Sequence, residues 1–149
     1  MTWLRFPALL VALFPLSFSL AHAEGILMAR TTMEFETALE VLQRSIEEHG
    51  YTVAHVQRCD GGMRGMGYET DNYKTVFFGK YDEITYLSKK HPELIPYLPL
   101  KIAIYAEGEE SILAILNPIV LGEFIPDTDL QIQLQRWYSD IKSVLADMR

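Results

Sequence analysis

Two apolar segments joined by a short acidic turn constrain the fold more than any other part of this sequence. Residues 100–106 alternate between apolar and other side chains, and residues 111–116 form a second apolar run. Period-two alternation is typical of a strand with one buried face. Gly108, in the acidic turn, supplies the positive φ that a tight hairpin requires. We therefore predict a central antiparallel β-hairpin.

Three other segments carry apolar residues at helical spacing, as helices packed on a sheet do. Thr31 precedes Glu34 by three residues, which predicts a capping box at the start of the first helix, although Thr32 could cap it equally well. Asp82 is expected to cap the second helix, and Asp127 or Thr128 the third. The third helix has the longest predicted buried stripe: Leu130, Leu134, Trp137, Ile141, Val144, Leu145 and Met148.

Further strands are predicted at residues 26–29, 51–57 and 74–78. Within the second of these, Val53 and His55 are expected on the same face. Strands and helices in this order predict an α+β fold of two layers. An antiparallel-rich sheet would carry its helices on one face.

The first 23 residues predict where the protein acts. Arg5 is the only charged residue before Glu24, an apolar segment spans residues 6–20, and Ala21-His22-Ala23 has the small-x-small pattern of a signal peptidase site. The apolar segment is shorter than the ~20 residues that span a bilayer. We expect residues 1–23 to be a cleaved signal and residues 24–149 to form a single periplasmic or secreted domain with no membrane span.

The charge balance limits the partners of such a domain. The formal net charge is −7, and removing Arg5 with the signal makes it −8, because residues 1–23 hold no Asp or Glu. An acidic protein gains nothing from the phosphates of nucleic acid or from anionic lipid. We therefore expect no nucleic-acid partner.

Two short motifs resemble a known family. Phe78-Gly79 precedes a predicted helix, and the sequence Leu98-Pro99-Leu100-Lys101 enters an apolar strand. Together they resemble the DUF302 family, a family of domains of unknown function, and the resemblance extends over residues 26–148. Lys80-Tyr81 stands where family members often carry Asn-Pro, which indicates a divergent branch. The resemblance implies a two-layer α+β fold that can dimerise, and it implies no established reaction.

The glycine-rich segment at residues 58–68 contains the candidate site. Its four glycines are expected to prevent a helix. Cys59, Met63 and Met66, with His55 from the preceding strand, are ligands that copper(I) or a haem iron accepts. His55 and Cys59 lie ~13 Å apart on an extended strand, so they share a metal only if the chain turns between them. Two alternatives remain: a mobile hairpin tip with incidental methionines, and an intermolecular disulfide of the lone cysteine.

Other candidate residues favour structural roles. His91 precedes Pro92 at the end of the second predicted helix, where an imidazolium would interact with the helix dipole. Several tyrosines, including Tyr86, are more typical of a core than of a ligand pocket.

No catalytic signature is present: the sequence has no Gly-x-Ser-x-Gly, Walker loop, dinucleotide fingerprint or His-Glu-x-x-His. An enzyme is therefore not favoured. The sequence favours an exported, non-catalytic binding or accessory domain that acts through a homodimer or a periplasmic protein partner. The alternative is a small periplasmic copper- or haem-binding redox protein that uses Cys59, Met63 and Met66.

Overall fold

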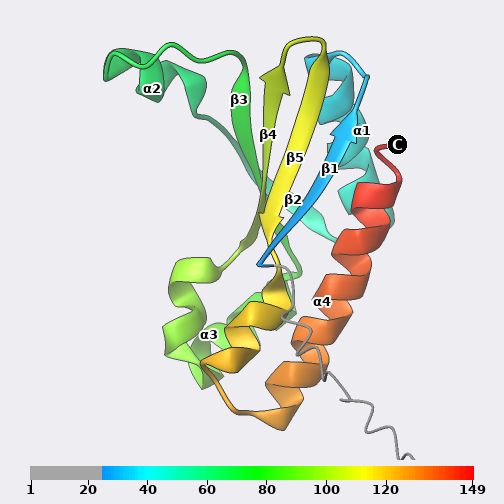
Figure 1. Cartoon of the computed structure of the whole chain (residues 1–149). Helices are drawn as coiled ribbons and strands as arrows, with labels where there is room; N and C mark the ends of the chain where they lie inside the picture. Colours follow the sequence, from blue (N-terminus) through cyan, green and yellow to red (C-terminus); the bar gives the residue numbers. More distant parts are fainter. Residues whose placement is uncertain (1–24) are drawn as a thin grey trace, which may run out of the picture.

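Four antiparallel pairings build one five-stranded sheet with the order β1-β5-β4-β3-β2 (Figure 1). A computed structural model describes residues 25–149, so the expected signal at residues 1–23 lies outside the described residues. The strands are β1 (Ile26–Thr31), β2 (Thr52–Arg58), β3 (Tyr73–Gly79), β4 (Leu100–Glu107) and β5 (Glu110–Leu116).

The predicted central hairpin is confirmed as β4 and β5. Glu107 pairs with Glu110 across the turn, and Gly108 has φ +63° there. Leu100, Ile102 and Ile104 are 7%, 0% and 0% exposed, so the alternating apolar residues do face the core.

Helices α1 (Phe35–Glu48) and α4 (Thr128–Ala146) lie on one face of the sheet (Figure 1). Helix α3 (Tyr81–Lys90) and two 3₁₀ helices, Pro92–Tyr97 and Pro118–Glu123, gather beyond one end of the strands. Helix α2 (Asp60–Gly65) stands out from the body at the other end. The predicted two-layer α+β fold is confirmed.

Helix α4 follows its prediction closely. Asp127 is its N-cap, because a side-chain oxygen of Asp127 accepts the Leu130 N–H at 2.8 Å. All seven residues of the predicted stripe are buried, and Trp137 is 1% exposed. The indole N–H of Trp137 donates to Glu83 of α3 at 2.9 Å, which ties the two helices together.

The two other predicted caps are wrong. Glu34 caps α1, since its carboxylate accepts the N–H groups of Glu36 and Thr37. Thr31 lies in β1, and its Oγ1 accepts the N–H of Met33 at 3.3 Å, two residues before the helix begins, rather than an N–H of the first turn. The N-cap position of α3 is Lys80, so Asp82 lies inside the first turn, where an acidic side chain still favours the helix dipole.

The predicted facing of β2 is also wrong. A register shift lies between Val53 and His55, so these two residues do not share a face. Val53 and Val56 pack against the core, whereas His55 pairs with Phe77 on the other face. A β-bulge of this kind inserts one residue and changes which side chains face inward after it.

Gly79 lies where α3 approaches the sheet. A Cβ at this position would be 2.2 Å from Cδ1 of Ile84 and 3.2 Å from its Cγ1. We expect Gly79→Ala to lower the free energy of unfolding by ~1–3 kcal/mol through overpacking. Ile84→Val removes the clashing methyl group. In urea titrations of the unmodified chain, the two single variants and the double variant, the loss of unfolding free energy in the double variant should be smaller than the sum of the two single losses by at least ~0.5 kcal/mol. Strict additivity would contradict this contact.

Candidate functional site

None of the helices in residues 25–149 covers the second face of the sheet, which we call the open face. Met28 pairs with Ala114, Ala114 pairs with Ala103, and Ala103 pairs with Thr75, so these side chains lie in one row across four strands. Applying the same register to the neighbouring rows gives the residues of the open face: Ile26, Met28, Arg30, His55, Gln57, Tyr73, Thr75, Phe77, Lys101, Ala103, Tyr105, Ile112, Ala114 and Leu116.

The open face is largely apolar and partly exposed to solvent. Ile26, Met28 and Leu116 are 51%, 54% and 38% exposed. Ile112 is only 2% exposed, yet it does not belong to the core cluster, because it lies between Arg30 and Tyr105 on this face. Contiguous exposed apolar surface of this kind marks interaction sites.

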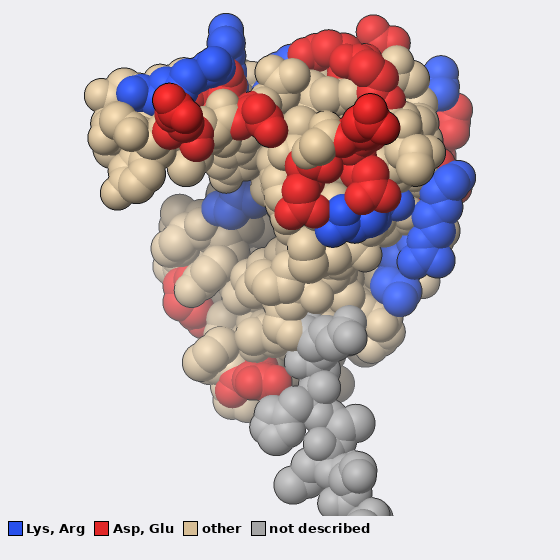
Figure 2. Space-filling view, turned by 45° about the horizontal axis from the view of Figure 1, so that its top comes forward, with Lys and Arg blue, Asp and Glu red and all other residues tan. Residues whose placement is uncertain are grey.

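The two ends of the open face carry different charges. At the β4–β5 turn, Arg30 forms ion pairs with Glu107 and Glu110. Figure 2 shows acidic side chains gathered over this end of the molecule. Lys101 lies six residues earlier on β4, toward the other end, and its Nζ donates to the Pro96 carbonyl at 3.2 Å. The open face therefore has two glutamates and one arginine at one end, and a lysine at the other.

Residues 59–72 connect β2 to β3 and form a projecting arm (Figures 1 and 2). The prediction that its glycines prevent a helix is wrong, because residues 60–65 form α2. The carboxylate of Asp60 is 2% exposed and accepts hydrogen bonds from Arg58 at 3.0–3.2 Å and from Arg64 one helical turn later. These bonds join both ends of the helix and offset the low helix propensity of its glycines.

Acid is expected to disorder the arm. The hydrogen bond from Arg58, with that from Arg64, lowers the pKa of Asp60 from 3.8 to about 2. A carboxyl with a lowered pKa stabilises the folded arm above pH 3.8, and this contribution is lost as the pH falls toward 2. Amide exchange in α2 should therefore accelerate relative to α4 between pH 4 and pH 2, after correction for intrinsic rates.

Asp60→Asn provides the control for this prediction. The variant should exchange rapidly in α2 already at pH 5, with no further acid step confined to the arm. Equal protection of α2 at pH 4 and pH 2 in the unmodified chain would contradict the role of this carboxylate.

Cys59, Met63 and Met66 all lie in the arm. Cys59 is half-buried, and its Sγ is 3.6 Å from the Gln57 carbonyl oxygen and 3.5 Å from Thr75 Oγ1. The Met63 N–H donates to the Cys59 carbonyl at 3.2 Å, which places these two residues one helical turn apart. Met66 follows α2 and is 72% exposed.

The structure does not bring His55 to these three residues. Strand β2 is extended through Arg58, so the chain does not turn between His55 and Cys59. His55 lies on the open face instead, with Nε2 3.1 Å from Gln57 Oε1 and its ring 6.3 Å from that of Phe77. Within residues 25–149, no three or more His, Cys, Asp or Glu side chains are grouped to hold a metal ion. A thiolate–thioether site in the arm stays a prediction.

The sequence prediction did not identify the open face as a candidate site. A signal for it was present: residues 26–29 and 112–116 are continuous apolar runs rather than alternating ones. Continuous runs are typical of strands that are covered on both faces. In this chain, helices α1 and α4 cover only one face, so the runs indicate a second surface that another molecule can cover.

None of the helices described between residues 25 and 149 has the length and hydropathy needed to cross a membrane. A family model described as "Domain of unknown function DUF302" matches residues 28–148. The fold is similar to the crystal structure of an uncharacterized conserved DUF302 protein from Bacillus stearothermophilus, with a TM-score of 0.76 and 15% identity over 85% of this chain and 100% of the other. At this identity the similarity concerns the fold alone. No curated protein matches the chain.

Proposed function

The chain belongs to the DUF302 family, and we propose that it is an exported, non-catalytic binding domain that works as a pair of identical copies joined through their open faces. The observation that supports the proposal is the exposed apolar surface of Ile26, Met28 and Leu116 on the sheet face that α1 and α4 leave uncovered. Export rests on the sequence pattern of residues 1–23. The absence of any catalytic sequence signature supports a binding role.

The size of the open face suits a second copy. Five strands ~4.8 Å apart and six residues of ~3.3 Å each give a flat area of roughly 500 Å². Two such faces bury about 1,000 Å², which reaches the lower limit for a specific interface. The side chains that project from each sheet add to this flat area. The arm carries further exposed apolar side chains, Tyr68 at 61% and Met66 at 72%.

The charges of the open face are complementary to themselves. A two-fold axis that lies between the sheets and is perpendicular to the strands would turn the second copy end over end. This operation places Lys101 of each copy near Glu107 and Glu110 of the other, and it superposes the apolar middle rows. Small side chains in these rows, Ala103 and Ala114, allow the two sheets to approach closely.

Zero-length carbodiimide crosslinking tests this arrangement directly. A mixture of ¹⁵N-labelled and unlabelled chains should yield crosslinked peptides that join Lys101 of one copy to Glu107 or Glu110 of the other. Lys101→Gln should abolish these peptides, whereas Lys142→Gln, on α4, should leave them unchanged. Two results would contradict the proposed pair. One is crosslinks between labelled and unlabelled chains that do not involve Lys101, and the other is the loss of all such crosslinks at micromolar protein concentration.

A further inference from the structure

Strand β1 is an edge strand of the sheet, and its outer edge carries unpaired backbone groups (Figure 1). The Asn117 N–H donates to the Gly25 carbonyl at 3.0 Å, so these two residues form a hydrogen-bonded pair of the β1–β5 ladder. Because such pairs alternate along an antiparallel ladder, the N–H and C=O groups of Ile26, Met28 and Arg30 point away from β5. No strand of residues 25–149 lies beyond β1, so these groups are available to a further strand.

Strand β1 lacks the features by which edge strands usually avoid other chains, namely a proline, a bulge or an outward-pointing charge. It has no proline and no register shift, and its one charged side chain, Arg30, is held in ion pairs by Glu107 and Glu110. The other edge strand, β2, has a bulge between Val53 and His55 and continues into the arm. Strand addition is therefore favoured at β1 over β2.

A groove of about 130 Å³ lies between β1 and the last turns of α4. It is lined by Leu27, Met28, Lys142, Leu145, Ala146 and Arg149. Leu27 and Leu145 are each 5% exposed, so the floor of the groove is apolar. Lys142 and Arg149 form no ion pair with any residue of the described part of the chain.

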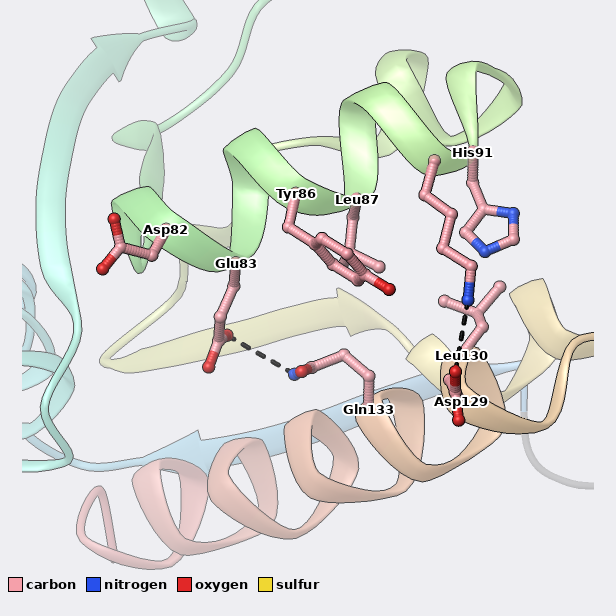
Figure 3. Close-up of a pocket in the computed structure, with 9 residues that line it drawn as sticks. Asp82, Glu83, Tyr86, Leu87, His91, Asp129, Leu130 and Gln133 are labelled. Atoms are coloured by element: carbon pink, nitrogen blue, oxygen red, sulfur yellow. Dashed lines mark hydrogen bonds and ion pairs between the residues drawn. The ribbon is translucent and has the colours of Figure 1, made fainter.

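The charged groups between α3 and α4 differ in this respect, because they already bond one another. Glu83 accepts hydrogen bonds from Gln133 at 3.4 Å and from Arg136, and Lys90 donates to Asp129 at 3.4 Å (Figure 3). The two unpaired cations beside β1 therefore form a local basic site on a chain whose formal net charge is −7.

The charge of this groove selects among strands that could add to β1. Two-fold addition of a second β1 would bring the Lys142 and Arg149 side chains of both copies together, and like charges oppose that arrangement. An acidic strand has the complementary charge. Side chains of an added strand point alternately to the two faces of the sheet, so one set lies beside Ile26 and Met28 and the other beside the two cations.

We infer that β1 binds an extended peptide of alternating apolar and acidic residues, which adds to the sheet as a sixth, antiparallel strand. The apolar side chains would extend the open face, and the carboxylates would pair with Lys142 and Arg149. This inference does not depend on the pairing of the open faces, because that pairing joins the sheets by their faces and leaves the edge of β1 free in each copy.

NMR titration with the peptide acetyl-(Val-Glu)₄-amide tests the inference. We expect saturable binding and slower amide exchange at Ile26, Met28 and Arg30, with little change at Leu27 and Ala29, which already face β5. Acetyl-(Val-Lys)₄-amide should bind at least ~10-fold more weakly, because at 0.15 M salt charges act over a Debye length of ~8 Å and the nearby cations dominate. The net charge of the whole chain predicts the opposite order. Absence of saturable binding by the glutamate peptide, or equal binding of the lysine peptide, would overturn the inference.

Two N-methylated peptides test the backbone pairing. In an antiparallel addition the valines lie opposite Ile26, Met28 and Arg30, so the valine N–H groups donate to β1 and the glutamate N–H groups face solvent. N-methylation of the valines should abolish binding, whereas N-methylation of the glutamates should change the affinity by less than ~3-fold. Unchanged binding of the valine-methylated peptide would overturn the inference.

Substitutions in the protein locate the acidic side chains of the peptide. Lys142→Gln should weaken binding about 3-fold, and Lys142→Gln combined with Arg149→Gln about 10-fold. Lys89→Gln removes an equal charge from an exposed position on α3 and should leave the affinity unchanged. Equal effects of Lys142→Gln and Lys89→Gln would show only nonspecific charge attraction and would overturn the inference.

Discussion

Replacing Trp137 by alanine is expected to lower the free energy of unfolding by about 3–5 kcal/mol. Trp137 is 1% exposed at the middle of the α4 stripe, so truncation leaves a large cavity between α4 and the sheet. It also removes the N–H that donates to Glu83 at 2.9 Å. Small domains have about 5–15 kcal/mol of stability in total, so a large part would be lost. Urea denaturation followed by circular dichroism measures the change.

Two further variants on α4 separate the contributions of the buried ring, the hydrogen bond to Glu83 and the helix surface. Trp137→Phe keeps an aromatic ring but loses the bond to Glu83, so its cost should lie between zero and that of the alanine variant. Ile132 is 67% exposed, so Ile132→Ala should shift the stability by less than ~0.5 kcal/mol. A denaturation midpoint of Trp137→Ala equal to that of the unmodified chain would contradict the docking of α4.

Replacing Met28 by glutamate is expected to separate the paired copies. Met28 lies in the middle row of the open face, and a buried methionine contributes roughly 1.5–3 kcal/mol. Each change counts twice in a two-fold interface, and the new carboxylate adds a desolvation cost. The dissociation constant of the pair should therefore rise by roughly 100-fold or more in sedimentation equilibrium.

Ile132→Glu is the matched control for this variant. It places the same charge on α4, on the other side of the sheet, at an isoleucine that is 67% exposed against 54% for Met28, and should leave the dissociation constant unchanged. Equal dissociation constants of the Met28→Glu protein and the unmodified chain would contradict the interface. The monomeric stability of both variants should remain near that of the unmodified chain, because neither side chain belongs to the core.

Much of the fold could be predicted because local pattern and burial agree. The alternation in β4 and the helical stripe of α4 each place apolar residues on one face, and tertiary packing buries both. The facing of β2 could not be predicted, because the bulge after Val53 leaves no mark in the hydrophobic pattern. Helix α2 was missed because two arginine bonds to Asp60 outweigh the glycine content.

The candidate sites were harder to predict because they depend on distant segments. The continuous apolar runs of β1 and β5 hint at the open face, but its extent depends on the pairing of β1, at residues 26–31, with β5 some 80 residues later. Helices α3 and α4 likewise meet only in the folded chain, where Glu93 and Asp127 carboxylate oxygens lie 3.5 Å and 3.7 Å from the two ring nitrogens of His91. The sequence does contain Cys59, Met63 and Met66 close together, and the arm holds Cys59 and Met63 one turn apart.

Intermolecular NOEs from the Met28 methyl group test the open-face pairing most directly. A sample that mixes chains ¹³C-labelled at methionine methyls with unlabelled chains reports only contacts between copies when isotope filters are applied. The proposed pair predicts NOEs from Met28 to the open-face protons of the other copy that the two-fold axis brings opposite it, those of Met28 and of the neighbouring Ala114, and protection of this methyl from a soluble paramagnetic agent. Met28 signals that lack intermolecular NOEs and are broadened by the agent as fully as a solvent-exposed methyl would contradict it.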